Sequence, residues 1–117
     1  MRLSVSSEIG PLKEVLVHRP GQELEQLTPP HLGRMLFDDI PYLAGAQREH
    51  DQFVQALRNE GASVRYLTDM VADTLVVEGV RTQFINEFIQ EGGPMAQYNQ
   101  EALQEMLGAI KDPKALV

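Results

Sequence analysis

The residues that point most directly to chemistry are the adjacent carboxylates Asp38 and Asp39, which lie in the apolar segment Leu36–Leu43, LFDDIPYL. Two interpretations are open. In the structural one, one carboxylate caps the helix that follows and the other pairs with Arg34 or Arg48. In the functional one, a carboxylate is placed to meet a cationic substrate, because acid and cation form strong charge-assisted hydrogen bonds.

Three histidines are also available for acid–base or metal chemistry, namely His18, His31 and His50. His50 falls on the apolar face of a predicted helix, where a single histidine is more often a hydrogen-bonded core residue than a ligand. Its neighbours Glu49 and Asp51 do not make a metal site with it, because consecutive helical residues point about 100° apart. No recognised ligand spacing is present, so we expect no metal.

The chain has 117 residues and no cysteine, which excludes disulfides, thiolate metal sites and any thiol nucleophile within it. Its length and 43% hydrophobic content are typical of a single globular domain. Seventeen acidic and ten basic residues give a formal charge of −7, and an acidic surface repels phosphate backbones. We therefore expect no nucleic-acid partner.

The sequence shows no pattern typical of a membrane span, a signal peptide or a nucleotide site. No apolar run approaches the ~20 residues of a membrane span, and the start of the chain, MRLSVSSEIG, has no apolar core of a signal peptide. Neither phosphate-binding glycine pattern is present. We expect no membrane association and no nucleotide cofactor, and a cytoplasmic location is compatible with these features.

The first half of the chain predicts a strand, a helical crossover and a second strand. We expect strands over Leu12–His18 and Ala62–Leu67, because both segments are rich in apolar and β-branched residues and bounded by turn residues. A short helix is expected over Pro30–Leu36, because Thr28 suits an N-cap and Pro29 the first helical position. A longer helix runs from Tyr42 and ends at Asn59-Glu60-Gly61, with Gly61 in a left-handed conformation. Its predicted apolar face comprises Leu43, Ala46, His50, Phe53 and Leu57.

The chain changes character near residue 68, which divides it into segments 1–68 and 69–117. The second segment predicts three short antiparallel helices that bury one another. The first covers Asp69–Val77, after a cap at Thr68. The other two carry apolar stripes ended by Gly92-Gly93-Pro94 and by Asp112-Pro113. The stripes consist of Phe84, Ile85, Phe88 and Ile89, and of Tyr98, Ala102, Leu103, Met106, Leu107 and Ile110. The methionines Met70, Met95 and Met106 are expected in the core.

Two strands joined by a helix are expected to pair in parallel. A parallel pair normally lies within a larger sheet covered on both faces. The chain is therefore short of strands, so either a partner supplies them or the chain is part of a longer protein, and we favour the second. Open sheet edges also predict self-association.

Three stretches together carry a specific resemblance: VSSEIGPLKEVLVHRPG over Val5–Gly21, LFDDIPYL over Leu36–Leu43, and QREHDQFVQALRNEGASVRYL over Gln47–Leu67. In this order and at these separations they resemble the N-terminal region of the arginine deiminase family. The resemblance covers about residues 4 to 68. The later helices are similar to the family's helical insertion only in general pattern.

The resemblance implies an α/β protein from the guanidine-modifying, or pentein, superfamily, whose fold is a five-bladed β/α propeller. Residues 1–68 would be one blade's worth of strand–helix–strand, and residues 69–117 part of a small helical bundle. Members of the family hydrolyse L-arginine to L-citrulline and ammonia. A cysteine thiolate attacks the guanidinium carbon and forms a thiouronium intermediate, a histidine acts as acid and base, and no metal or organic cofactor is needed.

By the same resemblance, Leu36 matches a position that lines the arginine pocket, and Phe37, Asp38 and Asp39 complete the substrate-binding motif. The family's cysteine, histidine and remaining substrate-binding residues have no counterpart here, so we expect no catalytic residue in this chain and no activity from it alone. We expect an N-terminal part of a homo-oligomeric deiminase. The alternatives are a non-catalytic interaction or regulatory domain of the superfamily, and part of an amidinotransferase.

Overall fold

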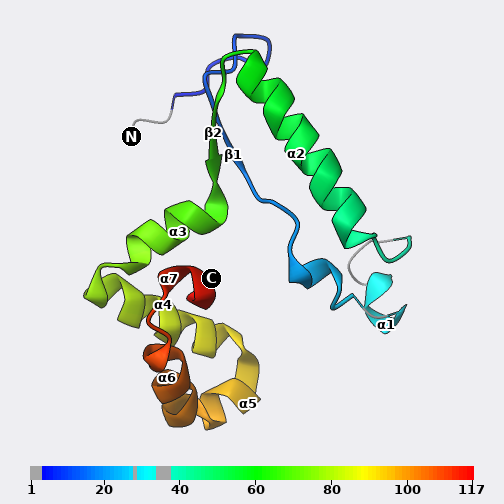
Figure 1. The fold of residues 1–117 in the computed structure, drawn as a ribbon. Helices are drawn as coiled ribbons and strands as arrows, with labels where there is room; N and C mark the ends of the chain where they lie inside the picture. Colours follow the sequence, from blue (N-terminus) through cyan, green and yellow to red (C-terminus); the bar gives the residue numbers. More distant parts are fainter. Residues whose placement is uncertain (1–3, 28, 34–37) are drawn as a thin grey trace. The chain divides into compact units, whose positions relative to one another are not determined.

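Two short strands form a parallel sheet in the computed structural model, which describes residues 4–27, 29–33 and 38–117. They are β1 (Glu14–Val17) and β2 (Ser63–Tyr66), and they run in the same direction side by side (Figure 1). The Ser63 N–H donates to the Lys13 carbonyl at 2.9 Å. In each strand the second and fourth residues are half-buried and the first and third exposed, as the pleat of a strand dictates. Both predicted strands and their parallel pairing are confirmed, each strand being shorter than predicted.

Helix α2 (Leu43–Asn59) is the crossover between the strands (Figure 1). Most of its predicted apolar face is confirmed, but the placement of Phe53 on that face is wrong. The Phe53 side chain is 56% exposed, whereas its neighbour Val54 is 1% exposed. Both residues continue the helical spacing from His50, and a shift of one position turns a side chain by about 100°. Spacing alone could not decide between them.

The turn that ends α2 accounts for the glycine at position 61. Gly61 has φ +84°, its N–H donates to the Arg58 carbonyl, and the Ala62 N–H donates to the Leu57 carbonyl, both at 3.0 Å. This pair of bonds is the Schellman motif, which satisfies carbonyls at the end of a helix. Ala62 is buried directly before β2. The predicted left-handed Gly61 is confirmed, and this turn sets where the second strand begins.

Between β1 and α2 the structure contains a 3-10 turn, η1 (Gln22–Leu24), and a short helix, α1 (Pro29–Leu32). Pro29 takes the first helical position, as expected for a residue with a fixed φ and no N–H. The predicted cap Thr28, and the last residues of the predicted helix over Pro30–Leu36, lie outside the described residues.

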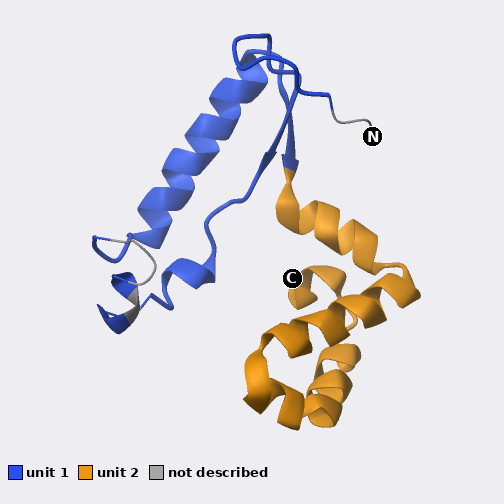
Figure 2. Ribbon diagram, turned by 180° about the vertical axis from the view of Figure 1, so that it is seen from behind, with its two compact units in different colours: residues 1–65 blue, residues 66–117 orange. Residues whose placement is uncertain are grey.

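The chain divides into two compact units, residues 1–65 and 66–117 (Figure 2). The described residues of the second unit form five helices rather than the predicted three: α3 (Leu67–Leu75), α4 (Glu78–Glu91), α5 (Gly93–Tyr98), α6 (Gln100–Ala109) and α7 (Pro113–Leu116). Its buried core comprises Ala72, Leu75, Ile85 and Ile89. Across the described residues, no helix is both long enough and apolar enough to cross a membrane.

Polar contacts define how these helices pack. Gln104 Nε2 donates to Asn86 Oδ1 at 2.7 Å, and Gln90 Nε2 donates to Gln100 Oε1 at 3.4 Å, so α4 and α6 are antiparallel. Lys114 Nζ of α7 lies 2.6 Å from Asp69 Oδ1 of α3, and this carboxylate raises the pKa of Lys114. The predicted antiparallel packing of α4 and α6 is confirmed.

Three details of the second unit differ from the predictions. Thr68 is not an N-cap, because α3 begins at Leu67, directly after β2, with Tyr66 in the capping position. Tyr98 does not share a face with α6, because a turn at Asn99 separates it from that helix, and its side chain is 87% exposed. Asp112 caps α7, its Oδ1 accepting from the Lys114 N–H at 3.0 Å.

Two of the three methionines predicted in the core are on the surface. Met95 and Met106 are 75% and 57% exposed, and only Met70 is half-buried. Short helices have room to bury only one narrow side, so helical spacing identifies a common face without identifying which faces are covered.

The Schellman turn gives a direct test of the crossover. The substitution Gly61→Ala should lower the free energy of unfolding by about 1–2 kcal/mol, because a Cβ disfavours φ +84°. Space is not the reason, since no atom lies within 4 Å of the Cβ position. Gly79→Ala is the matched control, because Gly79 is also unobstructed but has an ordinary helical φ. Urea denaturation of the wild type and the two variants measures both free energies of unfolding. Equal effects at Gly61 and Gly79 would contradict the assignment of a strained left-handed φ to position 61.

Candidate functional site

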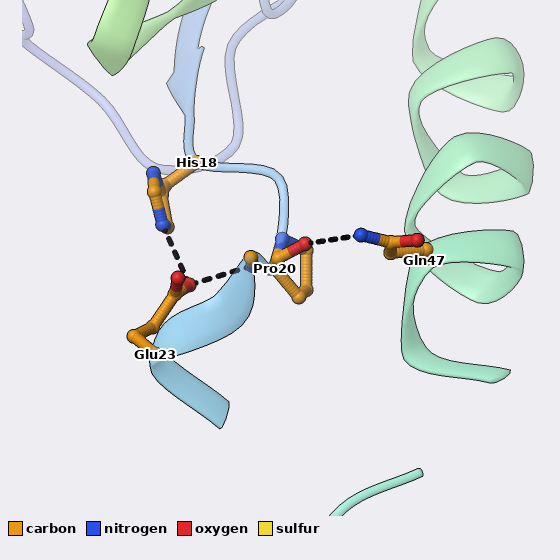
Figure 3. A network of polar contacts seen from close by, with 5 residues as sticks. His18, Pro20, Glu23 and Gln47 are labelled. Carbon is orange, nitrogen blue, oxygen red and sulfur yellow. Dashed lines mark hydrogen bonds and ion pairs between the residues drawn. The ribbon is translucent and has the colours of Figure 1, made fainter. Parts of the chain in front are cut away.

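The turn after β1 contains a network of polar contacts that involves His18, Pro20, Glu23 and Gln47 (Figure 3). One oxygen of Glu23, Oε1, accepts the Gly21 N–H at 2.7 Å and lies 2.9 Å from His18 Nε2. A carboxylate that accepts a backbone N–H is stabilised in its charged form. Accordingly the Gly21 N–H, followed by the His18 side chain, holds the pKa of Glu23 below its usual value.

Gly21 lets the Glu23 carboxylate approach the backbone closely. A Cβ at position 21 would lie 2.5 Å from Glu23 Oε2, so a larger residue there would make this flexible side chain shift. The preceding residue connects the turn to the crossover helix, since the Pro20 carbonyl accepts a hydrogen bond from Gln47 Nε2 at 2.9 Å. The HRPG sequence after β1 therefore forms a turn attached to α2 (Figure 3).

A second link joins the same turn to α2. Arg19 donates through Nε and Nη2 to the two oxygens of Asp51, at 2.9 and 3.0 Å. These hydrogen bonds lower the pKa of Asp51, and the charge of His50 adds to the effect. Both side chains are about half exposed, so the pair adds little stability. Its two parallel hydrogen bonds do fix the orientation of the Arg19 guanidinium relative to Asp51.

The three histidines belong to three different elements of the first unit. His18 belongs to the turn after β1, His50 is half-buried on α2, and His31 lies in α1. Asp51 is engaged by Arg19. Within the described parts of the chain, no group of three histidines or acids could hold a metal ion.

Asp38 and Asp39 are exposed and lie just before α2. Asp39 Oδ1 accepts the N–H of its neighbour Ile40 at 2.7 Å. The capping interpretation is wrong for α2, because Tyr42 occupies the N-cap and no side chain bonds to the first turn. Among the described residues, neither aspartate is ion-paired with Arg48. The alternative partner Arg34, and the predicted pocket residues Leu36 and Phe37, lie outside the described part of the chain.

A hollow of about 780 Å³ lies on the second unit, lined by residues 97–102 and Gln104. Carboxamides and the Tyr98 ring dominate its wall, and none of the candidate residues above contributes to it. Its chemistry is that of a polar surface between α5 and α6.

Comparison with known proteins identifies the family. A family model described as arginine deiminase matches residues 33–114, a stretch that includes Asp38 and Asp39. The chain is 50% identical over 115 residues to the arginine deiminases of Streptococcus sanguinis strain SK36 and Streptococcus uberis, and 49% identical to that of Streptococcus pyogenes.

The chain belongs to the arginine deiminase family.

Each of these arginine deiminase alignments covers 98% of this chain but only 28% of the relative. The chain thus spans little more than a quarter of the length of the arginine deiminases it matches.

The residues that sequence reasoning missed are Arg19, Glu23 and Gln47. HRPG predicts a turn and belongs to the first family-like stretch, but nothing in the spacing shows that Arg19 contacts a residue 32 positions later. The one available signal was Glu23 two residues after Gly21, a separation at which a carboxylate can return to a backbone N–H.

The turn after β1 predicts a pH dependence that can be followed at one atom. Glu23 has a lowered pKa, so its contacts contribute stability above its ordinary value of 4.5 and lose it as the pH falls through the lowered folded-state value. The Gly21 amide resonance should titrate with Glu23 in this acidic range, and Glu23→Gln should abolish that step. Glu25→Gln, an exposed acid outside the network, is the matched control. An unchanged Gly21 titration in Glu23→Gln would contradict the hydrogen bond.

Proposed function

We propose that this chain is the N-terminal part of an arginine deiminase, which hydrolyses L-arginine to L-citrulline and ammonia. The observation that carries the proposal is the 50% identity that extends over 98% of the chain to arginine deiminases several times its length. Because the match covers 98% of the chain, it includes residues of both compact units and is more than a similarity of one short motif.

The reaction we propose uses a nucleophile that the rest of the deiminase supplies. A guanidinium is stabilised by resonance, and a thiolate is the strong nucleophile that can attack its carbon, break a C–N bond and expel ammonia to give a thiouronium intermediate. This chain contains no cysteine. On this proposal it contributes structure and part of the substrate pocket, and it is inactive by itself.

The two compact units have separate roles in the proposal. Residues 1–68 would form one blade's worth of the propeller, which is supported by the parallel strand–helix–strand of the first unit. Residues 69–117 would belong to the helical domain. A two-stranded parallel sheet needs further strands at its edges, and the remaining deiminase polypeptide would provide them. Without them we expect the isolated chain to self-associate. We propose a cytoplasmic, homo-oligomeric enzyme.

Leu36, Phe37, Asp38 and Asp39 would form part of the wall of the arginine pocket. What supports this is the different state of the acids in the first unit. Glu23, Asp38, Asp39 and Asp51 are all exposed, but Glu23 and Asp51 are already engaged by His18 and Arg19. Among the described residues Asp38 and Asp39 form no ion pair, and Asp39 Oδ1 accepts the neighbouring Ile40 N–H. An exposed carboxylate keeps acceptor positions for the planar fork of a guanidinium.

The proposed division of labour is tested by complementation. This chain alone should form no citrulline from arginine. Mixed with the remainder of the Streptococcus sanguinis deiminase, prepared without the stretch that matches this chain, it should restore citrulline formation. The remainder alone and the remainder with its own matching stretch are the controls. Turnover by the isolated chain would contradict the proposal, and failure to complement where the native stretch succeeds would favour a regulatory relative.

The pocket residues are tested in a chimera that joins this chain to the same remainder. Asp38→Asn and Asp39→Asn should each raise the KM for arginine about tenfold, because a lost charge-assisted hydrogen bond costs about 1.5 kcal/mol. The kcat should change far less, since neither acid is proposed to act on the breaking bond. Glu60→Gln removes an exposed acid elsewhere in the first unit and should leave both constants unchanged. Wild-type KM in both aspartate variants would remove these residues from the pocket.

A further inference from the structure

Helix α4 carries apolar side chains on two different sides. Ile85 and Ile89 are 6% and 1% exposed and belong to the core of the second unit. Phe88, by contrast, is 61% exposed, and its ring stacks on that of Phe84 with 6.4 Å between centroids and 19° between planes. The single apolar stripe predicted over residues 84–89 is therefore two stripes on different sides of α4. One of them, Ile85 and Ile89, is buried.

The second stripe is largely uncovered. We call it the α4 outer face, and it consists of the exposed N-cap residue Val77, the exposed Val80 and Phe88 of the helix, and the half-buried Phe84 between them. Separations of three, four and four residues place these side chains on one side of a helix. Asn86 accepts a hydrogen bond from α6 and Gln90 donates one to it, so α6 occupies a different side of α4.

Such a face is more than scattered surface exposure. Single exposed apolar residues are ordinary, but an apolar stripe containing a stacked aromatic pair is typical of an interface. The anchors of a helix that binds or receives another helix follow this same spacing.

Charge indicates what kind of partner fits. The second unit carries eight acidic side chains and three basic ones. Glu87 and Glu91 are exposed next to Phe88, and Glu87 also accepts a hydrogen bond from Gln83 at 2.7 Å. Two copies of this face would bring like charges together, which disfavours a symmetric pair. A helix with lysine or arginine beside its apolar side would be complementary.

We propose that the α4 outer face is the docking surface for a basic amphipathic helix of the remaining deiminase polypeptide. The inference rests on the proposed function, because the arginine deiminases that match the chain extend well beyond the 28% of their length that it covers. An apolar centre with charge at one margin is the composition of a lasting interface. The occupant is thus a segment of the same enzyme rather than a passing partner.

The test measures the affinity of this chain for the remainder of the Streptococcus sanguinis deiminase by calorimetry. The double variant Phe84→Ser/Phe88→Ser should bind at least tenfold more weakly, because aromatic side chains are the usual anchors of an interface. The control Met95→Ser/Tyr98→Ser removes two exposed apolar residues from α5, outside the α4 outer face, and should bind as the wild type does. Far-UV circular dichroism of each variant establishes that its helices are intact.

A second variant keeps the test decisive if the double serine variant does not fold. Glu87→Lys/Glu91→Lys leaves the apolar stripe in place and should also weaken binding about tenfold, with the weakening reduced at high salt. Wild-type affinity in this variant would contradict the inference that the docked helix is basic.

The remaining outcomes separate this inference from the proposed function. If the remainder binds the wild-type chain and restores citrulline formation, but binds the serine variant equally well, the proposed function stands and the docking surface is wrong. If light scattering shows a dimer of the isolated chain that the serine variant abolishes, the occupant is a second copy and the inference is overturned. If the remainder binds no form of the chain and no citrulline is formed, the proposed function fails and the inference fails with it.

Discussion

The parallel pairing of β1 with β2 is the constraint on which the first unit depends. Parallel strands cannot be joined by a tight turn, so the chain must return along a crossover before the Ser63 N–H can reach the Lys13 carbonyl. Helix α2 provides that return, and the Schellman turn at Gly61 directs the chain into β2. On the face of the sheet that carries the exposed residues, Arg65 pairs with Glu14 across the two strands. Four residues per strand offer few further contacts, which explains why the polar links of the β1 turn are attached to α2.

The parts of this fold that follow from local chemistry could be predicted, and those that depend on packing could not. Gly61 and Pro29 are where the sequence places them, because a left-handed φ and a missing N–H restrict each to one kind of position. Val54 rather than Phe53 is buried because of neighbours that lie outside the helix, and no helical spacing contains that information. Met95 and Met106 are exposed for the same reason.

In the candidate site, too, features of the local sequence could be predicted and contacts that depend on packing could not. Asp38 and Asp39 could be singled out because two adjacent acids in an apolar segment are conspicuous, whatever the fold. The Arg19–Asp51 pair could not, because its partners are brought together only by the return of α2 past the end of β1. The capping role first open to the aspartates fails because Tyr42, not an aspartate, is the N-cap of α2, and no side chain caps that helix. Short-range capping rules therefore could not decide how these exposed acids are used.

The second unit leaves an apolar surface that water does not favour. A stacked phenylalanine pair lies on a helix whose other side is already buried, and the exposed part of that pair costs free energy in water. The exposed aspartates before α2 are different, because a charged carboxylate on the surface is well solvated. The apolar stripe therefore gains free energy when any apolar partner covers it, whereas the aspartates gain it only where charge-assisted hydrogen bonds replace those to water.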